Sequence, residues 1–166
     1  MKSAFTLKQC AGAALFLGLT TAPGFAQGTS DATMNVVIQD VMKVVFSNNS
    51  ATFTYATADI YQNGFTQSIA DQLSVTSNRQ WGLTVKTATA NLVSGTNTIP
   101  VSNVRVGANA GAGTALSTTP ISLLSAQAAV TESKVTLTYS TSANNAAFLK
   151  PAGTYSTTLT FTVVYE

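Results

Sequence analysis

Hydroxyl side chains are the most abundant groups in this sequence that could do chemistry. Serine and threonine make up 39 of the 140 residues from 27 to 166. A hydroxyl becomes a nucleophile only beside a base, most often a histidine, and the chain contains no histidine. A lysine could replace it in a Ser-x-x-Lys motif, but the nearest run, 131–134 (Thr-Glu-Ser-Lys), lacks that spacing and is more typical of a charged turn. We therefore interpret the hydroxyls as polar surface.

Carboxylates and glycines give equally weak signals for catalysis or cofactor binding. Asp59 and Asp71 flank Asn63-Gly64 and could approach each other, as paired acids or a weak calcium site would require. No run of alternating acidic ligands supports calcium, so a solvated turn is the favoured interpretation. The glycine-rich run 107–113 (GANAGAG) does not open a helix after a strand, as a dinucleotide loop would, and we interpret it as a linker loop. We expect no enzyme, no cofactor and no metal.

The amino-acid composition narrows the possible classes of protein. Only 8% of the 166 residues are charged, whereas an ordinary soluble domain has about 25%. Residues 27–166 carry six basic and six acidic side chains and so sum to zero, without the basic surface expected of a nucleic-acid-binding protein. The frequent β-branched and aromatic residues argue against disorder. The length predicts one domain.

The first 26 residues resemble a secretory signal peptide. Lys2 and Lys8 make a positively charged n-region, 11–19 is an apolar run (AGAALFLGL), and Gly24-Phe25-Ala26 forms a small-residue cleavage site. The run is shorter than the ~20 residues that cross a bilayer. A short N-terminal anchor helix is the alternative. Cleavage after Ala26 would remove Cys10, the only cysteine, so we expect a secreted protein without disulfides.

The rest of the chain has the period-two pattern of β-strands. Trp81, Leu83 and Val85 alternate with more polar residues, as do Val135, Leu137 and Tyr139. The pattern predicts further strands at 32–38, 51–55, 69–77, 101–106 and 155–165, and an edge strand at 121–124. We interpret Asn63-Gly64 as a hairpin turn and the stretch around 121–124 as a connection, in which 125–129 could form one helical turn. We predict an all-β, immunoglobulin-like antiparallel sandwich of about seven strands, with a sandwich domain at 41–166 after an N-terminal strand within 27–40.

The C-terminal run resembles the end of chaperone–usher fimbrial subunits. That pattern has a glycine fourteen residues from the end, alternating apolar residues and a penultimate aromatic, and here they are Gly153, Tyr155, Leu159, Phe161, Val163 and Tyr165. The resemblance implies an incomplete sandwich that is bound by a periplasmic chaperone and an usher, and then completed by a neighbour's N-terminal strand. The candidate donor strand presents Ala32, Met34, Val36 and Ile38 on one face. Many fimbrial subunits have a disulfide, which this chain would lack.

A second resemblance is to WxL cell-surface domains. Trp81-Gly82-Leu83 matches their short motif, and 155–163 (YSTTLTFTV) is similar to their distal motif. This resemblance implies attachment to the peptidoglycan of a Gram-positive wall. A core tryptophan on a central strand is the alternative interpretation of Trp81, and we favour it.

The two resemblances lead to one functional expectation. We expect a secreted, non-enzymatic structural or adhesion protein of the cell surface, first of all a pilin-like fimbrial subunit that self-assembles by β-strand addition. A WxL-like wall-binding domain and a carbohydrate-binding module, in which exposed tyrosine or tryptophan stacks on sugar, are the alternatives.

Overall fold

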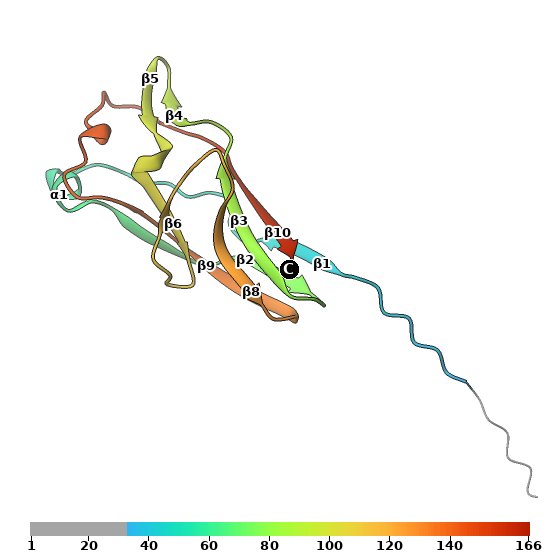
Figure 1. Ribbon diagram of the computed structural model, residues 1–166. Coiled ribbons are helices and arrows are strands. Elements are labelled where there is room, and N and C mark those ends of the chain that lie inside the picture. Colours follow the sequence, from blue (N-terminus) through green and yellow to red (C-terminus); the bar gives the residue numbers. More distant parts are fainter. Residues whose placement is uncertain (1–32) are drawn as a thin grey trace, which may run out of the picture. The chain divides into compact units, whose positions relative to one another are not determined.

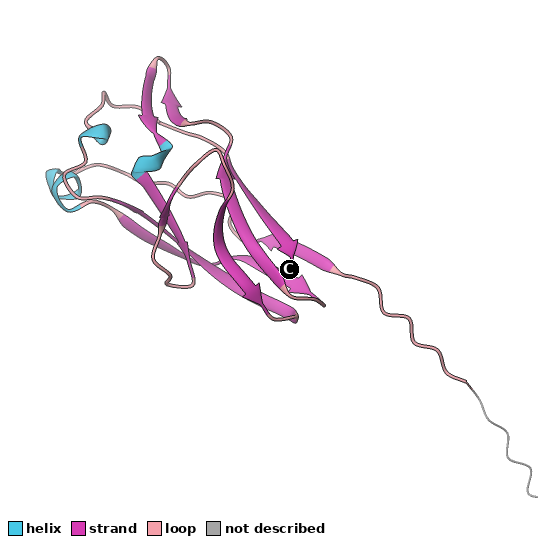
Figure 2. Ribbon diagram, in the orientation of Figure 1, coloured by secondary structure: helices cyan, strands magenta, loops and turns pink. Residues whose placement is uncertain are grey.

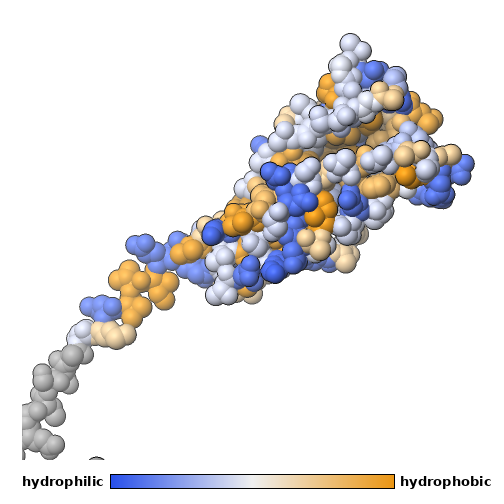
Figure 3. Space-filling model, turned by 180° about the vertical axis from the view of Figure 1, so that it is seen from behind, coloured by the Kyte–Doolittle hydropathy of each residue, from blue (hydrophilic) through white to orange (hydrophobic). Residues whose placement is uncertain are grey.

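A computed structural model describes residues 33–166, and the chain divides into two compact units at Val37 and Ile38. We call residues 33–38 the arm and residues 39–166 the body, so that Ile38, the first residue of the second unit, is counted with the arm. The arm has no helix or strand, and its apolar side chains are exposed, with Met34 at 84%, Val36 at 68% and Ile38 at 81%. Figure 3 shows this apolar surface along the N-terminal segment.

The body consists of antiparallel sheets (Figure 1). One sheet has the order β1 (Met42–Phe46), β2 (Thr66–Ser77), β9 (Val130–Thr141), β6 (Val104–Ala108) and β7 (Thr114–Ala115). A second has the order β10 (Leu159–Tyr165), β3 (Trp81–Thr87) and β8 (Ile121–Gln127), and β4 (Asn91–Ser94) pairs with β5 (Asn97–Pro100). The helical elements are short: α1 (Ala58–Asn63), η1 (Val101–Asn103) and η2 (Ala146–Phe148) (Figure 2).

The core is built from the alternating apolar residues of the long strands. Leu73 and Val75 of β2, Leu83 of β3, and Val135 and Leu137 of β9 are all 0% exposed. These side chains belong to one apolar cluster, which draws on strands of both larger sheets. Their period of two places one face of each strand inward and leaves the serine- and threonine-rich face outward. The prediction of an all-β antiparallel sandwich is confirmed.

Several local predictions are wrong. The described residues contain ten strands rather than about seven, and the first begins at Met42, so 33–40 is not a strand. Residues 51–55 are not a strand either. Asn63 ends helix α1, and Gly64 caps it at φ +79°, with its N–H donating to the Ile60 carbonyl at 2.9 Å. No hairpin forms there, because residues 58–63 form helix α1 and 51–55 makes no backbone hydrogen bond to β2.

Other boundaries also differ from the pattern. Residues 125–127 continue β8 instead of forming a helical turn, and 131–134 lies within β9 instead of in a turn. The last strand begins at Leu159, and before it only Ser156 forms an isolated bridge, to Val93. Within 107–113, Gly107 belongs to β6, and a Cβ on it would lie 2.5 Å from the Gly111 carbonyl oxygen. That tight approach is the physical reason for glycine in this connection.

Candidate strand-binding groove

Two strands at sheet edges face each other across one side of the sandwich. β1 is the edge of the five-stranded sheet, and β10 is the edge of the three-stranded sheet. The rings of Phe46, at the end of β1, and Phe161, in β10, lie with centroids 5.7 Å apart. An edge strand presents unpaired backbone N–H and C=O groups, so each can accept a further strand.

Residues 49–55 continue from β1 and form one wall of a groove. Their burial alternates, with Ala51, Phe53 and Tyr55 partly buried and Thr52 and Thr54 exposed. This alternation is that of a strand, yet 51–55 make no backbone–backbone hydrogen bond to any residue that the structure describes. The segment therefore has the side-chain pattern of a strand without a strand partner.

The opposite wall is the segment that leads into β10. Its backbone is paired on one side only, by the Ser156 bridge to Val93 and by the Ala88 N–H, which donates to the Thr158 carbonyl at 2.9 Å. Tyr155 is half-buried, and its hydroxyl donates to the Pro151 carbonyl at 2.9 Å. The side of this segment that faces the groove is open.

Between the two walls lies a cavity of about 930 Å³. Its floor reaches the core: Tyr139 is 1% exposed, Val104 3% and Leu116 5%, and all three line it. Lys150 is the only charged side chain among its lining residues. The cavity is thus a mostly uncharged channel that opens onto the interior of the sandwich.

An aromatic cluster closes one end of the cavity. Tyr55 stacks on Phe148 with centroids 4.7 Å apart and an interplanar angle of 11°, and it contacts Tyr61 at 5.1 Å. Its hydroxyl is 2.5 Å from the Thr141 hydroxyl. Burial is the main cause that raises the pKa of Tyr55 above its usual value, although the bond to Thr141 lowers it. Phe53 joins the cluster through Phe65, at 5.1 Å.

A polar pair interrupts the apolar floor. The Tyr139 hydroxyl donates to the Gln72 side-chain oxygen at 3.0 Å, and Gln72 is only 3% exposed. Gln72 is buried beside the equally buried Leu73, because β2 has an irregular register between Ile69 and Leu73, with Asp71 at φ +50°. The Gln72 carbonyl also accepts from the Ser47 N–H at 2.9 Å, at the point where β1 ends. Burial raises the pKa of Tyr139 to about 12.

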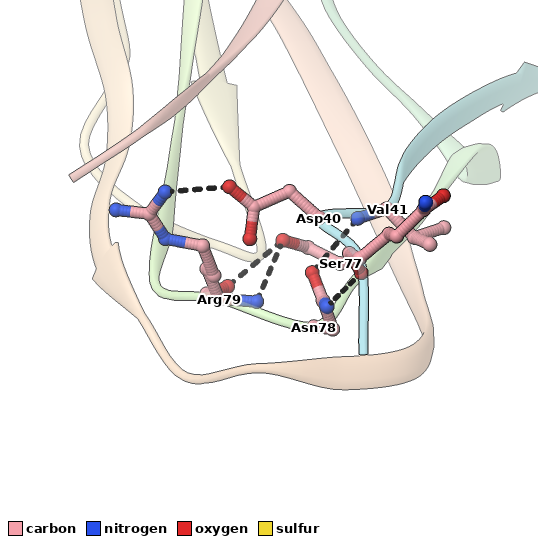
Figure 4. A network of polar contacts seen from close by, with 6 residues as sticks. Asp40, Val41, Ser77, Asn78 and Arg79 are labelled. Atoms are coloured by element: carbon pink, nitrogen blue, oxygen red, sulfur yellow. Dashed lines mark hydrogen bonds and ion pairs between the residues drawn. The ribbon is translucent and has the colours of Figure 1, made fainter. Parts of the chain in front are cut away.

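The base of the arm, residues 39–41, is held by the connection between β2 and β3 (Figure 4). The Asn78 side chain donates to the Gln39 carbonyl at 2.7 Å and accepts from the Val41 N–H at 2.9 Å. Arg79 pairs with Asp40 at 2.8 Å, and both side chains are about half exposed. We call these contacts the clamp.

The structure separates the residues of the sequence motifs. Leu159, Phe161 and Val163 are partly buried on one face of β10, and Gly153 and Tyr155 lie before it along the groove wall. Tyr165, 37% exposed, lies under the Arg79 guanidinium, 4.9 Å from its ring centroid. Met34, Val36 and Ile38 are in the arm, whereas Ala32 lies outside the described residues.

Trp81 and Leu83 occupy the core. Trp81 is 1% exposed, its indole N–H donates to the Ala128 carbonyl at 3.1 Å, and Leu83 is 0% exposed. A ring so enclosed has no open face for stacking on a sugar.

The two carboxylates near Asn63-Gly64 have separate partners. The Asn63 amide donates to Asp59 at 2.6 Å, and Asp71 lies 3.6 Å from Lys134.

Sequence reasoning missed the groove wall at 49–55, the buried pair of Gln72 and Tyr139, and the clamp. The alternation of 51–55 was the available signal for the wall, but it predicted an internal strand. Within residues 33–166, no cluster of three or more histidine, cysteine or acidic side chains could hold a metal. The described part of the chain also has no helix that is long and apolar enough to cross a membrane.

Comparison with known proteins gives no family. No protein-family model matches the chain, and no curated protein matches it.

Proposed function

We propose that this protein is a secreted fimbrial subunit with an incomplete immunoglobulin-like sandwich, and that it assembles by β-strand addition. The observation that carries the proposal is the unpaired segment 51–55, which has a strand's side-chain pattern and lines a largely uncharged cavity of about 930 Å³. A strand inserted between this segment and β10 would pair with free backbone on both sides and cover apolar surface.

The arm of a second copy has the chemistry to fill the groove. Residues 33–39 carry no charged side chain, and Met34, Val36 and Ile38 are exposed. In an extended strand these three side chains lie on one face at ~6.6 Å intervals. Burying each would contribute roughly 1.5–3 kcal/mol before the cost of ordering the arm. Until assembly, a periplasmic chaperone is the proposed occupant of the same groove.

The chain's own geometry favours insertion in a neighbour over insertion in the same subunit. β1 runs from Met42, opposite Ser77, to Phe46, opposite Leu73, and the wall 49–55 lies beyond Phe46. If the arm folded back across 39–41, Ile38 would lie level with Met42 and Met34 level with Phe46. Its apolar face would then end where the wall begins, and the cavity would remain empty.

A peptide experiment tests the proposal on the body alone. A synthetic peptide of residues 28–40 should bind the protein that lacks residues 27–37 and raise its melting temperature in proportion to the logarithm of peptide concentration. The Val36→Asp peptide should not bind, because it would bury a carboxylate without a partner. The Asn35→Asp peptide has the same charge on the opposite face and should bind like the parent peptide.

Two outcomes would contradict strand addition. One is the failure of the parent peptide to bind a correctly folded body, as judged by circular dichroism. The other is equal binding of all three peptides, since the groove would then not distinguish the two faces of the strand. Electron microscopy of the native cell surface provides the second measurement, because the proposal requires that the chain be found in filaments.

A further inference from the structure

The clamp holds the arm base as a neighbouring strand would. In an extended chain, backbone groups of residues 39 and 41 point to the same side. The Asn78 amide meets both, with its nitrogen donating to the Gln39 carbonyl and its oxygen accepting from the Val41 N–H. The Asn78 backbone N–H adds a bond to the Val41 carbonyl at 3.2 Å. These three bonds fix residues 39–41 in an extended conformation directly before β1.

The same connection also holds the C-terminal strand. The Arg79 guanidinium pairs with Asp40 and lies 4.9 Å from the centroid of the Tyr165 ring. The Gln80 carbonyl accepts from the Glu166 N–H at 3.0 Å. Residues 78–80 therefore connect the arm base to β10, which is the strand beside the subunit's own groove.

We propose that Asn78 and Arg79 are positioning residues that make the link between successive copies of this chain a rigid joint. The inference rests on the proposed function, in which residues up to Ile38 belong to the neighbour's sandwich. Because the clamp begins at Gln39, no free residue remains between the inserted segment and the body that donates it. The direction of the donated strand is then set by the body, and one filled groove is oriented relative to the next.

The two contacts contribute differently to the joint. An exposed ion pair such as Asp40–Arg79 is weak by itself. Asn78 is the stronger determinant, because its amide replaces two backbone partners of the arm base at once. Removal of the clamp would leave residues 39–41 as a flexible linker, whose conformational freedom would appear as bending between copies.

The test compares filaments of the mature chain with filaments of the Asn78→Asp, Arg79→Ala double variant. Aspartate has the shape of asparagine and can still accept from Val41, but it cannot donate to the Gln39 carbonyl. Asn103→Asp is the matched control, because the Asn103 amide also donates to a backbone carbonyl, that of Pro100, and accepts from Asn145. Filament curvature in electron micrographs gives the persistence length for each protein.

The double variant should still assemble, but the persistence length of its filaments should be at least about twofold shorter than that of the unsubstituted chain. The Asn103→Asp filaments should be as stiff as those of the unsubstituted chain. The affinity of the variant's groove for the 28–40 peptide should change by less than about twofold, because the clamp lies outside the groove. A merely structural defect would lower peptide affinity and melting temperature together.

The outcomes separate the two proposals. Filaments of unchanged stiffness from the double variant, with normal peptide binding, would refute the rigid joint and leave strand addition intact. Loss of stiffness only together with peptide binding would also refute it, because the clamp would then act on the groove. An unsubstituted chain that binds no peptide and forms no filaments would refute both.

Discussion

Replacement of Trp81 with alanine should destabilise the body strongly. Trp81 is 1% exposed within the core cluster, and its indole N–H bonds the Ala128 carbonyl at 3.1 Å. Deletion of a buried aromatic side chain costs ~3–5 kcal/mol through lost transfer energy and the cavity that remains. For a domain of this size, that corresponds to a fall in melting temperature of roughly 10–20 °C.

The assay is denaturant unfolding followed by circular dichroism, with Val93→Ala as the control. Val93 is an apolar strand residue that is 42% exposed, so its truncation should cost less than about 1 kcal/mol. Binding to purified peptidoglycan is measured for the same proteins. A Trp81→Ala protein of unchanged stability that had lost a wall-binding activity of the parent would refute the core assignment and favour a WxL-like binding site.

Three other results follow from the sequence and structure. Gly64→Ala should lower the free energy of unfolding by roughly 1–3 kcal/mol, because Gly64 has φ +79° and a Cβ there would collide with the Thr141 carbonyl oxygen. Gly95→Ala is the control and should lower it less, because Gly95 has φ +57° but a Cβ would have no atom within 4 Å. Urea unfolding midpoints compare the two variants. Burial raises the pKa of Tyr139 from its usual 10 to about 12. The buried, protonated Tyr139 therefore makes its full contribution to the free energy of unfolding below pH 10, and this contribution is lost as the pH rises to 12. That loss is about 2–3 kcal/mol, and Tyr139→Phe should remove this part of the alkaline decline in unfolding titrations; an identical decline in both proteins would contradict the assignment. Intact mass of secreted protein should correspond to Gln27–Glu166 without a disulfide, and a mass that includes residues 1–26 would contradict signal cleavage.

The sequence could predict the strands that pair with other strands of the same chain. The alternation at 81–85 and 135–139 predicts strands whose apolar faces meet in the core, and β3 and β9 are central strands of their sheets. The period of two determines which residues point inward, so Trp81 could be placed in the core without coordinates. Pairing order and boundaries could not be obtained in this way, because the pattern specifies a face and not a neighbour.

Local signals failed where longer-range contacts decide the conformation. Asn63-Gly64 has the composition of a hairpin turn, and the positive φ of Gly64 agrees with it. The preceding residues instead close a helical turn, with Ile60 as the acceptor, and 51–55 makes no backbone hydrogen bond to β2. The burial of Gln72 also depends on a register irregularity in β2 that composition does not reveal.

The two segments with a strand pattern but no strand share one physical feature. Residues 34–38 have apolar side chains at alternate positions, with Asn35 and Val37 between them, and 51–55 alternates apolar side chains with threonines. Neither segment pairs with another strand among residues 33–166. One leaves its apolar side chains exposed, and the other lines a cavity that needs apolar side chains. Pairing between chains would produce such segments, because each must have the side-chain alternation of a strand although its partner strand belongs to another copy. The two failed strand predictions are therefore complementary, and they support the same proposal of strand addition between copies.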